Sequence, residues 1–412
     1  MVTRLDDIRS AFARSNTGPS QNTYLWQDEA WTLAEARRAG PSSPLAGLPV
    51  SVKDCFDLAG SPTSLGTRFY QQKNGIATQD SWLVERLRAS GAVIMGKTHL
   101  HPLAYGITGE NAEFGDCIQP GNPGNLTGGS SSGAVASVLE GSAYAAIGTD
   151  TGGSVRVPAA LSGLVGYRAS WGRGDWRGGY HLAESFDTFG WLFRHLADAP
   201  LLGSLFDSSL CGGVEATNRR PPTTFAVVPD AFLHDCDPLI VANLRRCQAS
   251  LEALGLAAQT INVDWWADSR EIFAPIQASE ACRHHAGHFD QFEGSIRQRL
   301  AWGQSLAPAD VIRARQRHAE FRDRMDDLLA TYSLLLLPAA PVTRLAAGAD
   351  HAETRPRLLR YTTPLSLSGM PVLSLPYFEN GRPAGGMQLA AAREDDARLL
   401  ALAAALAPRR TL

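Results

Sequence analysis

The sequence predicts an α/β protein in which a large mixed central β-sheet is covered by helices on both faces, as a single domain with a helical insert. Segments of helical periodicity alternate with apolar runs of strand length, the order of elements found in such sheets. Apolar residues make up 44% of the 412 residues and charged residues 19%, which is ample material for a large core. Between about residues 215 and 330 the pattern changes to longer, arginine-rich helices, and then the alternation returns.

The domain organisation follows from the same pattern. Length alone permits two or three domains, but the chain shows neither an internal repeat nor a linker. We therefore expect one domain over residues 1–412. Its core comprises about residues 40–215 and 330–412, and a helical cap or insert comprises about residues 215–330.

The individual elements can be placed in order along the chain. Residues 1–40 indicate two amphipathic helices. Residues 130–141 indicate a helix of small side chains, which permit close backbone approach, so this helix is expected to be central. Strands are predicted at residues 48–52, 92–96, 163–169, 333–342, 369–378 and 385–392, and further helices at 81–91, 311–332 and 395–407.

Charge and hydropathy exclude several classes of protein. The net charge is −3 and the pI is near 6.4, with both signs interspersed, so we expect neither a nucleic-acid nor a membrane surface. No apolar run approaches the roughly 18 residues of a membrane helix, and the N-terminus has no signal-peptide core. Six cysteines without a CxxC pair indicate reduced thiols in a cytoplasmic protein.

Lysine is rare in this chain. Only Lys53, Lys73 and Lys97 are lysines among 38 basic residues. Arginine keeps its proton in proteins, whereas a buried lysine can lose it, so a lysine in an apolar setting is a candidate base. Lys53 and Lys97 each follow a predicted strand, while Lys73 lies in the polar stretch QQKNG and is expected to have no catalytic role.

Two glycine–serine clusters, at residues 128–133 (GGSSSG) and 148–154 (GTDTGGS), carry the chemistry. Neither has the spacing of a phosphate or dinucleotide loop. Backbone N–H groups that converge on one point stabilise a tetrahedral oxyanion, and glycine permits that geometry. A serine after two glycines places a hydroxyl beside such a hole, but it needs a proton acceptor to become a nucleophile. The clusters therefore favour acyl transfer.

Together with SVKD around Lys53, these clusters resemble the motifs of the amidase signature family, the Ser–cis-Ser–Lys amidohydrolases. In this resemblance Lys53 is the catalytic lysine, Ser130 is the bridging serine and Ser154, 24 residues further on, accepts the acyl group. The similarity runs from about residue 20 to the C-terminus. It implies the amidase signature fold, a large mixed sheet covered by helices.

The resemblance also implies a mechanism, the hydrolysis of a carboxamide C–N bond through an acyl-enzyme. Ser154 attacks the amide carbon, and Ser130, which relatives hold across a cis peptide bond, passes the proton to Lys53. Lys53 is neutral at rest because it is desolvated. The oxyanion would be held by the backbone N–H groups of Thr151, Gly152, Gly153 and Ser154.

Expectations about the substrate are less specific. We expect a small-molecule amide, no cofactor and no metal, and leave open whether the chain forms a homodimer. His101 and Pro102 depart from the family pattern, as does the aromatic stretch at residues 171–184, so the substrate stays open. The residues expected to contact it are Gly129, Ser131, Asp150 and Trp171.

Several alternatives compete with this interpretation. Residues 129–133 also spell the G-x-S-x-G elbow of an α/β-hydrolase-type esterase with Ser131 as nucleophile, but a turn-forming segment precedes them instead of a strand. His284, His285 and His288 could bind a metal, yet no H-E-x-x-H motif supports this. The chain could be the amidase subunit of a tRNA-dependent amidotransferase. A non-catalytic interaction protein would be expected to have lost part of the triad.

Overall fold

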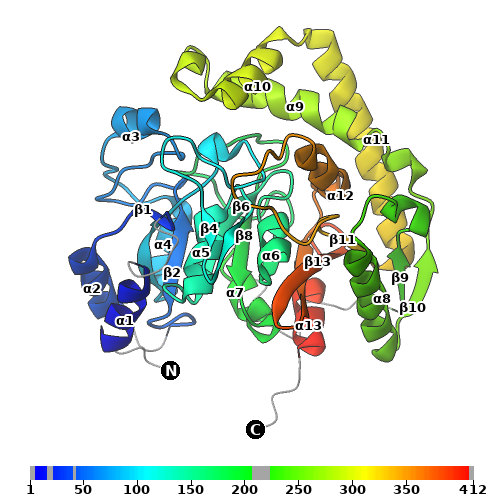
Figure 1. Cartoon of the computed structure of the whole chain (residues 1–412), viewed down its shortest axis with the longest axis horizontal. Helices are drawn as coiled ribbons and strands as arrows, with labels where there is room; N and C mark the ends of the chain where they lie inside the picture. Colours follow the sequence, from blue (N-terminus) through cyan, green and yellow to red (C-terminus); the bar gives the residue numbers. More distant parts are fainter. Residues whose placement is uncertain (1–4, 16–21, 40–42, 207–222, 408–412) are drawn as a thin grey trace.

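The computed structural model describes residues 5–15, 22–39, 43–206 and 223–407. Its centre is an eleven-stranded sheet in the order β1-β3-β2-β6-β8-β7-β12-β13-β11-β9-β10 (Figure 1). A separate hairpin pairs β4 (Ile118–Gln119) with β5 (Asn122–Leu126). The strands of the large sheet are β1 (Tyr24–Trp26), β2 (Pro49–Lys53), β3 (Val93–Thr98), β6 (Ala145–Asp150), β7 (Val165–Arg168), β8 (Thr188–Phe193), β9 (Thr224–Val227), β10 (Ala257–Thr260), β11 (Leu334–Pro338), β12 (Val372–Glu379) and β13 (Arg382–Ala391).

The sheet is mixed, as the sequence predicted. β2 runs parallel to both β3 and β6, whereas β6, β8, β7, β12, β13 and β11 form an antiparallel series. Thirteen helices are found in the described residues. They are α1 (Leu5–Ser15), α2 (Glu29–Arg38), α3 (Arg68–Asn74), α4 (Trp82–Ala89), α5 (Ser132–Glu140), α6 (Arg156–Ser162), α7 (Ala199–Gly203), α8 (Pro238–Ala253), α9 (Ser269–His284), α10 (Gly294–Ser305), α11 (Pro308–Tyr332), α12 (Thr354–Ser368) and α13 (Asp396–Leu406).

Helices cover both faces of the sheet. Along β6 the buried side chains alternate, because successive residues of a strand point to opposite faces. Ala145 and Ile147 belong to the main buried cluster, which includes side chains of α4, α7 and α13. Ala146 belongs to a second cluster built with α5 and α6. Every residue of β6 is buried, as expected for a central strand covered on both sides.

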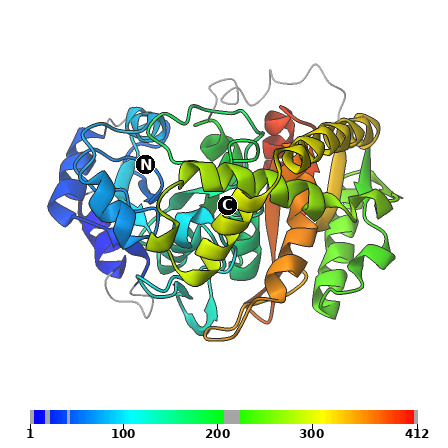
Figure 2. The same ribbon diagram turned by 90° about the horizontal axis from the view of Figure 1, so that it is seen from above.

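The segment predicted as a helical insert, about residues 215–330, contains strands as well as helices. Residues 224–260 supply β9 and β10, which extend the large sheet beyond β11, and α8 packs against β11 and β13. β9 pairs with β11 on one side and with the edge strand β10 on the other, and three of its four residues are buried. The helical portion is α9 to α11, which lies above one end of the sheet (Figures 1 and 2). The division into core and insert stays a prediction.

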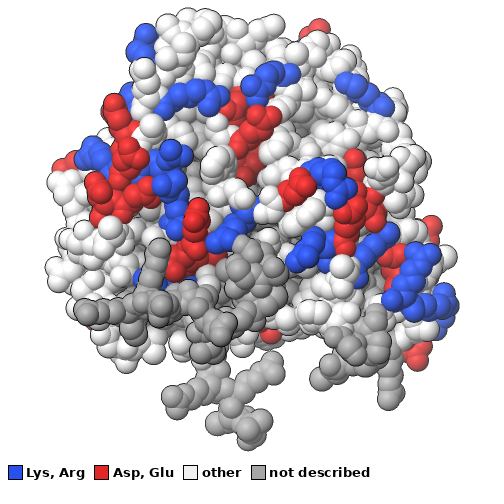
Figure 3. Space-filling model, turned by 180° about the vertical axis from the view of Figure 1, so that it is seen from behind, with Lys and Arg blue, Asp and Glu red and all other residues white. Residues whose placement is uncertain are grey.

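Three smaller observations bear on the expected class of protein. The cysteines that the structure describes, five of them, are free thiols, while Cys211 lies outside the described residues. None of the described helices is both long and apolar enough to cross a membrane. On the face seen in Figure 3, basic and acidic side chains lie beside one another.

Candidate active site

Lys53 occupies the end of β2 and is completely buried. Its Nζ donates to the hydroxyls of Ser130 (2.8 Å), Ser131 (3.2 Å) and Thr149 (2.7 Å). Thr149 lies near the end of β6, which runs parallel to β2, so the two strand ends meet at one edge of the sheet. Burial lowers the pKa of Lys53 to about 8. The lysine is thus surrounded by hydroxyl groups in a site where it loses its proton more readily than an exposed lysine does.

Lys97, at the end of the neighbouring strand β3, is arranged differently. It is equally buried, but its Nζ lies 2.6 Å from the carboxylate of Asp54. A buried ion pair holds the charge on a lysine, whereas no ion pair involving Lys53 is found in the described residues. Of the two buried lysines, only Lys53 therefore has the surroundings of a base.

Ser130 and Ser131 lie in the turn that leads into α5. The peptide bond between Gly129 and Ser130 is cis, as the resemblance implied. Ser131 Oγ accepts from Lys53 and donates to the carbonyl of Thr149 (3.2 Å), and the Ser131 N–H donates to the carbonyl of Ser154 (3.2 Å). This last bond joins the two glycine–serine clusters directly.

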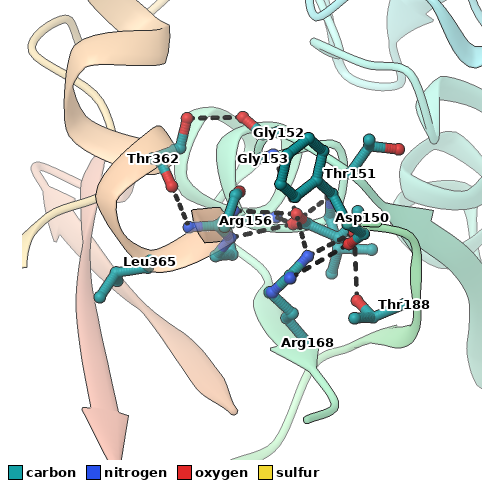
Figure 4. A network of polar contacts seen from close by, with 12 residues as sticks. Asp150, Thr151, Gly152, Gly153, Arg156, Arg168, Thr188, Thr362 and Leu365 are labelled. Atoms are coloured by element: carbon teal, nitrogen blue, oxygen red, sulfur yellow. Dashed lines mark hydrogen bonds and ion pairs between the residues drawn. The ribbon is translucent and has the colours of Figure 1, made fainter. Parts of the chain in front are cut away.

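The loop of residues 151–155 joins β6 to α6, and the Asp150 side chain supports it (Figure 4). The Asp150 carboxylate is fully buried and accepts from Arg156 and Arg168, at 2.9 Å and 3.0 Å. It also accepts from the backbone N–H groups of Gly153 (2.9 Å) and Val155 (3.1 Å). Burial alone would raise the pKa of Asp150, but the two arginines outweigh burial and hold the pKa below its usual value.

Asp150 changes two expectations about the site. Its carboxylate is saturated by these partners inside the core, so it has no group left with which to contact a substrate. The Gly153 N–H is directed at Asp150 and is not free for an oxyanion. In the part of the chain that the structure describes, the N–H groups of Thr151, Gly152 and Ser154 have no acceptor, and these can still donate.

Ser154 faces a small cavity. The cavity is bordered by the loop of Thr151 and Gly152, by Gln277 of α9 and by Arg355 and Leu359 of α12. Ser154 retains 5% exposure, whereas Lys53 and Ser130 have none. A substrate can therefore reach Ser154 while the base system stays sealed from water. The remaining lining residues are Ala104, Tyr105, Gly106, Ile107 and Leu182.

The other predicted substrate contacts lie away from this cavity. Gly129 packs against the backbone of Gly109, so closely that a Cβ atom there would lie 2.8 Å from the Gly109 nitrogen. Ser131 is buried against Lys53 and Thr149. Trp171 is 45% exposed and borders a separate cavity with Arg315 and His318. The neighbouring Trp176 stacks on Phe189 at the boundary of the core and does not line the Ser154 cavity.

The histidines of the metal alternative have separate partners. His285 bonds the hydroxyl of Tyr70 (2.8 Å), His288 bonds Lys73 (2.8 Å) and His284 lies 3.6 Å from Glu184. Within the described ranges, no group of three or more histidine, cysteine or acidic residues is placed to bind a metal ion.

Sequence reasoning missed Thr149, Gln277 and Arg355. Thr149 stands inside the second glycine–serine cluster, so its proximity to Ser154 along the chain was a usable signal. Gln277 and Arg355 are more than 120 residues from Ser154 and only the fold brings them to the cavity. No spacing rule connects such distant positions.

A buried lysine that donates to a serine, beside a glycine-rich loop with a second serine, is the arrangement of a serine hydrolase that uses lysine in place of histidine. Comparison with known proteins agrees. The family described as Amidase matches residues 16–400, and the chain belongs to this family.

Individual relatives span nearly the whole chain. Indoleacetamide hydrolase of Pseudomonas savastanoi is 29% identical, over 93% of this chain and 88% of the relative. The 2-amino-5-chloromuconic acid deaminase of Comamonas testosteroni is 29% identical, over 93% of this chain and 88% of the relative. A crystal structure of an amidase superposes with a TM-score of 0.85 at 29% identity, covering 98% of this chain and 95% of the other. The protein is an enzyme that hydrolyses an amide C–N bond.

Proposed function

We propose that the enzyme works through an ester formed on Ser154, with Ser130 and Lys53 as its proton relay. The observation that carries this proposal is the 2.8 Å contact between Lys53 Nζ and Ser130 Oγ in a fully buried setting without an acidic partner among the described residues. A lysine can accept a proton only when its neutral form is accessible, and burial provides this.

The reaction proceeds in two halves. Ser154 Oγ attacks the amide carbon while its proton passes to Ser130, whose own proton passes to Lys53. The tetrahedral oxyanion accepts from the N–H groups of Thr151, Gly152 and Ser154. The C–N bond then breaks, and the proton returns through Ser130 to the departing nitrogen. Water, deprotonated by the same relay, cleaves the ester, releasing the carboxylic acid and restoring Ser154.

Mass spectrometry of the intact protein tests this assignment. A rapidly quenched reaction with an aryl amide should show the wild-type chain carrying one acyl group, and a Ser154→Ala variant carrying none. The Ser131→Ala variant should still acylate. An acylated Ser154→Ala variant together with an inert Ser131→Ala variant would establish the elbow alternative. The structure speaks against that alternative because Ser131 is buried and no strand directly precedes it.

We further propose that the chain acts as a stand-alone amidase. This rests on the cavity of Ser154, whose walls include residues of α9 and α12 from the same chain. The purified chain should hydrolyse simple amides, and light scattering during gel filtration will report whether it is a monomer or a homodimer. If amidase activity required an added partner protein, the tRNA-dependent amidotransferase alternative would replace ours. The cytoplasmic location stays a prediction.

A further inference from the structure

The wall of the Ser154 cavity carries a positive charge without a counterion. Arg355, near the start of α12, borders the cavity together with Ser154. Its Nε is buried and has no hydrogen-bond partner. No carboxylate pairs with Arg355 anywhere in the described ranges, although 17 other arginine and lysine side chains form ion pairs with acidic residues there.

A second arginine reinforces this charge. Arg299 of α10 donates to the carbonyl of Tyr105 and lies over the Tyr105 ring, 4.9 Å from its centroid. Burial and the nearby Arg355 lower the pKa of Arg299 to about 10. Glu293 and Glu110 attract Arg299 only at longer range, since neither forms an ion pair with it. The same two arginines, added to burial, keep the pKa of His101 well below its usual value.

An uncompensated buried charge is costly unless something pairs with it. Arg355 carries a positive charge and its Nε–H is free to donate a hydrogen bond. Guanidinium groups bind carboxylates with two parallel hydrogen bonds. The cavity is otherwise lined by small or apolar side chains, by Tyr105 and by the amide of Gln277. A ligand that fills it and satisfies Arg355 must therefore be compact and anionic.

We propose that Arg355 binds a carboxylate of the substrate, so that the enzyme's substrates are amides that carry a carboxylate close to the scissile C–N bond. This inference rests on the proposed function, because it places the anion in the cavity of the nucleophile Ser154. Arg355 is a binding residue and takes no part in proton transfer.

Matched substrates provide the first test. Succinamate, glutaramate and 4-carbamoylbenzoate are compared with the neutral amides in which acetyl replaces the carboxylate, namely 4-oxopentanamide, 5-oxohexanamide and 4-acetylbenzamide. The wild-type enzyme should prefer at least one anionic amide, measured as kcat/KM for ammonia release. Arg355→Gln should lower kcat/KM for that amide by about 10–100-fold, the loss typical of a hydrogen bond to a charged group. The neutral partner should be nearly unaffected, and Arg355→Lys should recover part of the preference.

Arg270 of α9 supplies the matched control. It is exposed, lies near enough to act on Arg355 electrostatically, and does not border the cavity. Arg270→Gln should keep the preference, which separates direct contact from general charge. A wild-type enzyme that cleaves every neutral amide as well as its anionic partner would overturn the proposal. An equal loss for both members of a pair in Arg355→Gln would do the same.

Binding gives an independent readout. Calorimetric titration of the wild-type enzyme with succinate and glutarate should show binding that Arg355→Gln weakens and Arg270→Gln does not, with thermal melting as the folding control. If neither diacid binds the wild-type enzyme, the anion site is wrong even if amides are hydrolysed. If the diacids bind but no amide is hydrolysed faster than by Ser154→Ala, the proposed function has failed and the anion site stands.

Discussion

At the scale of the residue, Lys53 is the position on which the chemistry depends. The hydroxyls of Ser130, Ser131 and Thr149 accept hydrogen bonds from the ammonium form, and the Ser130 hydroxyl can donate to the single lone pair of the neutral amine, so either protonation state has a partner. Lys97, with its carboxylate partner, lacks this freedom. The chain uses arginine for nearly every other cation, and a guanidinium would not exchange a proton at Lys53.

Replacement of Lys53 by arginine should therefore be almost as damaging as replacement by alanine. Both variants should lose at least about 10²–10⁴ in single-turnover acylation, the usual contribution of a general base. Melting temperatures check folding, because arginine is bulkier and Lys53 is fully buried. Lys53→Met, which matches the volume, serves as a second uncharged variant. A folded Lys53→Arg enzyme with more than about a tenth of the native rate would remove the lysine from the mechanism.

The pH profile follows from the same residue. Lys53 is protonated below its pKa of about 8 and becomes a base above it, so kcat/KM should rise with pH and level off above about 8. Burial is the main cause of the lowered pKa. The profile should not change in a metal chelator. Loss of activity in chelator, restored by zinc, would contradict the lysine mechanism and favour the metal site at His284, His285 and His288.

At the scale of the element, the decisive unit is the turn between β6 and α6. Asp150 joins backbone N–H groups of the turn to Arg156 and Arg168, and Thr362 of α12 donates to the carbonyl of Gly152 at 2.5 Å. The turn is thereby fixed by the hydrogen bonds and ion pairs of Asp150 and by the hydrogen bond from Thr362 of α12. Its unpaired N–H groups are held in place before any substrate arrives, which is what oxyanion stabilisation requires.

Asp150→Asn tests this support. The change keeps the size of the side chain but leaves two buried arginines without their counterion, so the free energy of unfolding should fall by about 3–5 kcal/mol. Urea denaturation measures it. Asp230→Asn is the control, since Asp230 and its partner Arg245 are both exposed, and its effect should stay below about 1 kcal/mol. Equal effects of the two substitutions would show that the Asp150 network does not stabilise the fold.

The predictability of the elements has a physical explanation. Strands that end in a chemically distinctive residue, such as β2 at Lys53, are visible in the sequence, and so are the helices with small or periodic side chains. β6 and β8 escaped prediction because AAIGTD and TFGWLF combine glycine with buried small or aromatic residues and show no alternation. β9 and β10 escaped because four-residue strands between long helices leave a weak signal.

The active site, too, could be predicted from the sequence only in part. The motifs around Lys53, Ser130 and Ser154 were enough to propose a triad through their resemblance to the amidase signature, and the structure brings Lys53 and Ser130 to hydrogen-bond distance. The direction of the Gly153 N–H could not be inferred, because it depends on the side chain of Asp150 three residues earlier. The contribution of Arg355 depends on how α12 docks against the turn.

At the scale of the whole molecule, the helices above the sheet reach into the catalytic turn. A Cβ atom on Gly152 would lie 3.1 Å from the ring of Phe273 in α9, tighter than ordinary contact. Gly152→Ala should therefore shift the turn and lower kcat by roughly tenfold or more, since small displacements of catalytic groups are costly. Gly294→Ala, at a site in α10 with open space around it, should retain activity.

A second variant tests whether the contact with Phe273 causes the loss of kcat in Gly152→Ala. Phe273→Leu removes ring atoms and should restore part of the activity when combined with Gly152→Ala. Steady-state kinetics on the four proteins of this cycle give the coupling between α9 and the turn. If the effects of the two substitutions on kcat were strictly additive, α9 would contact the turn without constraining it.

The placement of the three lysines also makes the enzyme unusually simple to modify. Lys53 and Lys97 are sealed in the core, and Lys73 on α3 is exposed. An amine-reactive dye should therefore attach to the native protein at Lys73 and at the terminal amine, and the labelled enzyme should remain active. Once the terminal amine is blocked, coupling through Lys73 would immobilise the molecules in one orientation on a support. Dye that appears on Lys53 or Lys97 would report opening of the core, so the same reagent can follow unfolding without an engineered probe.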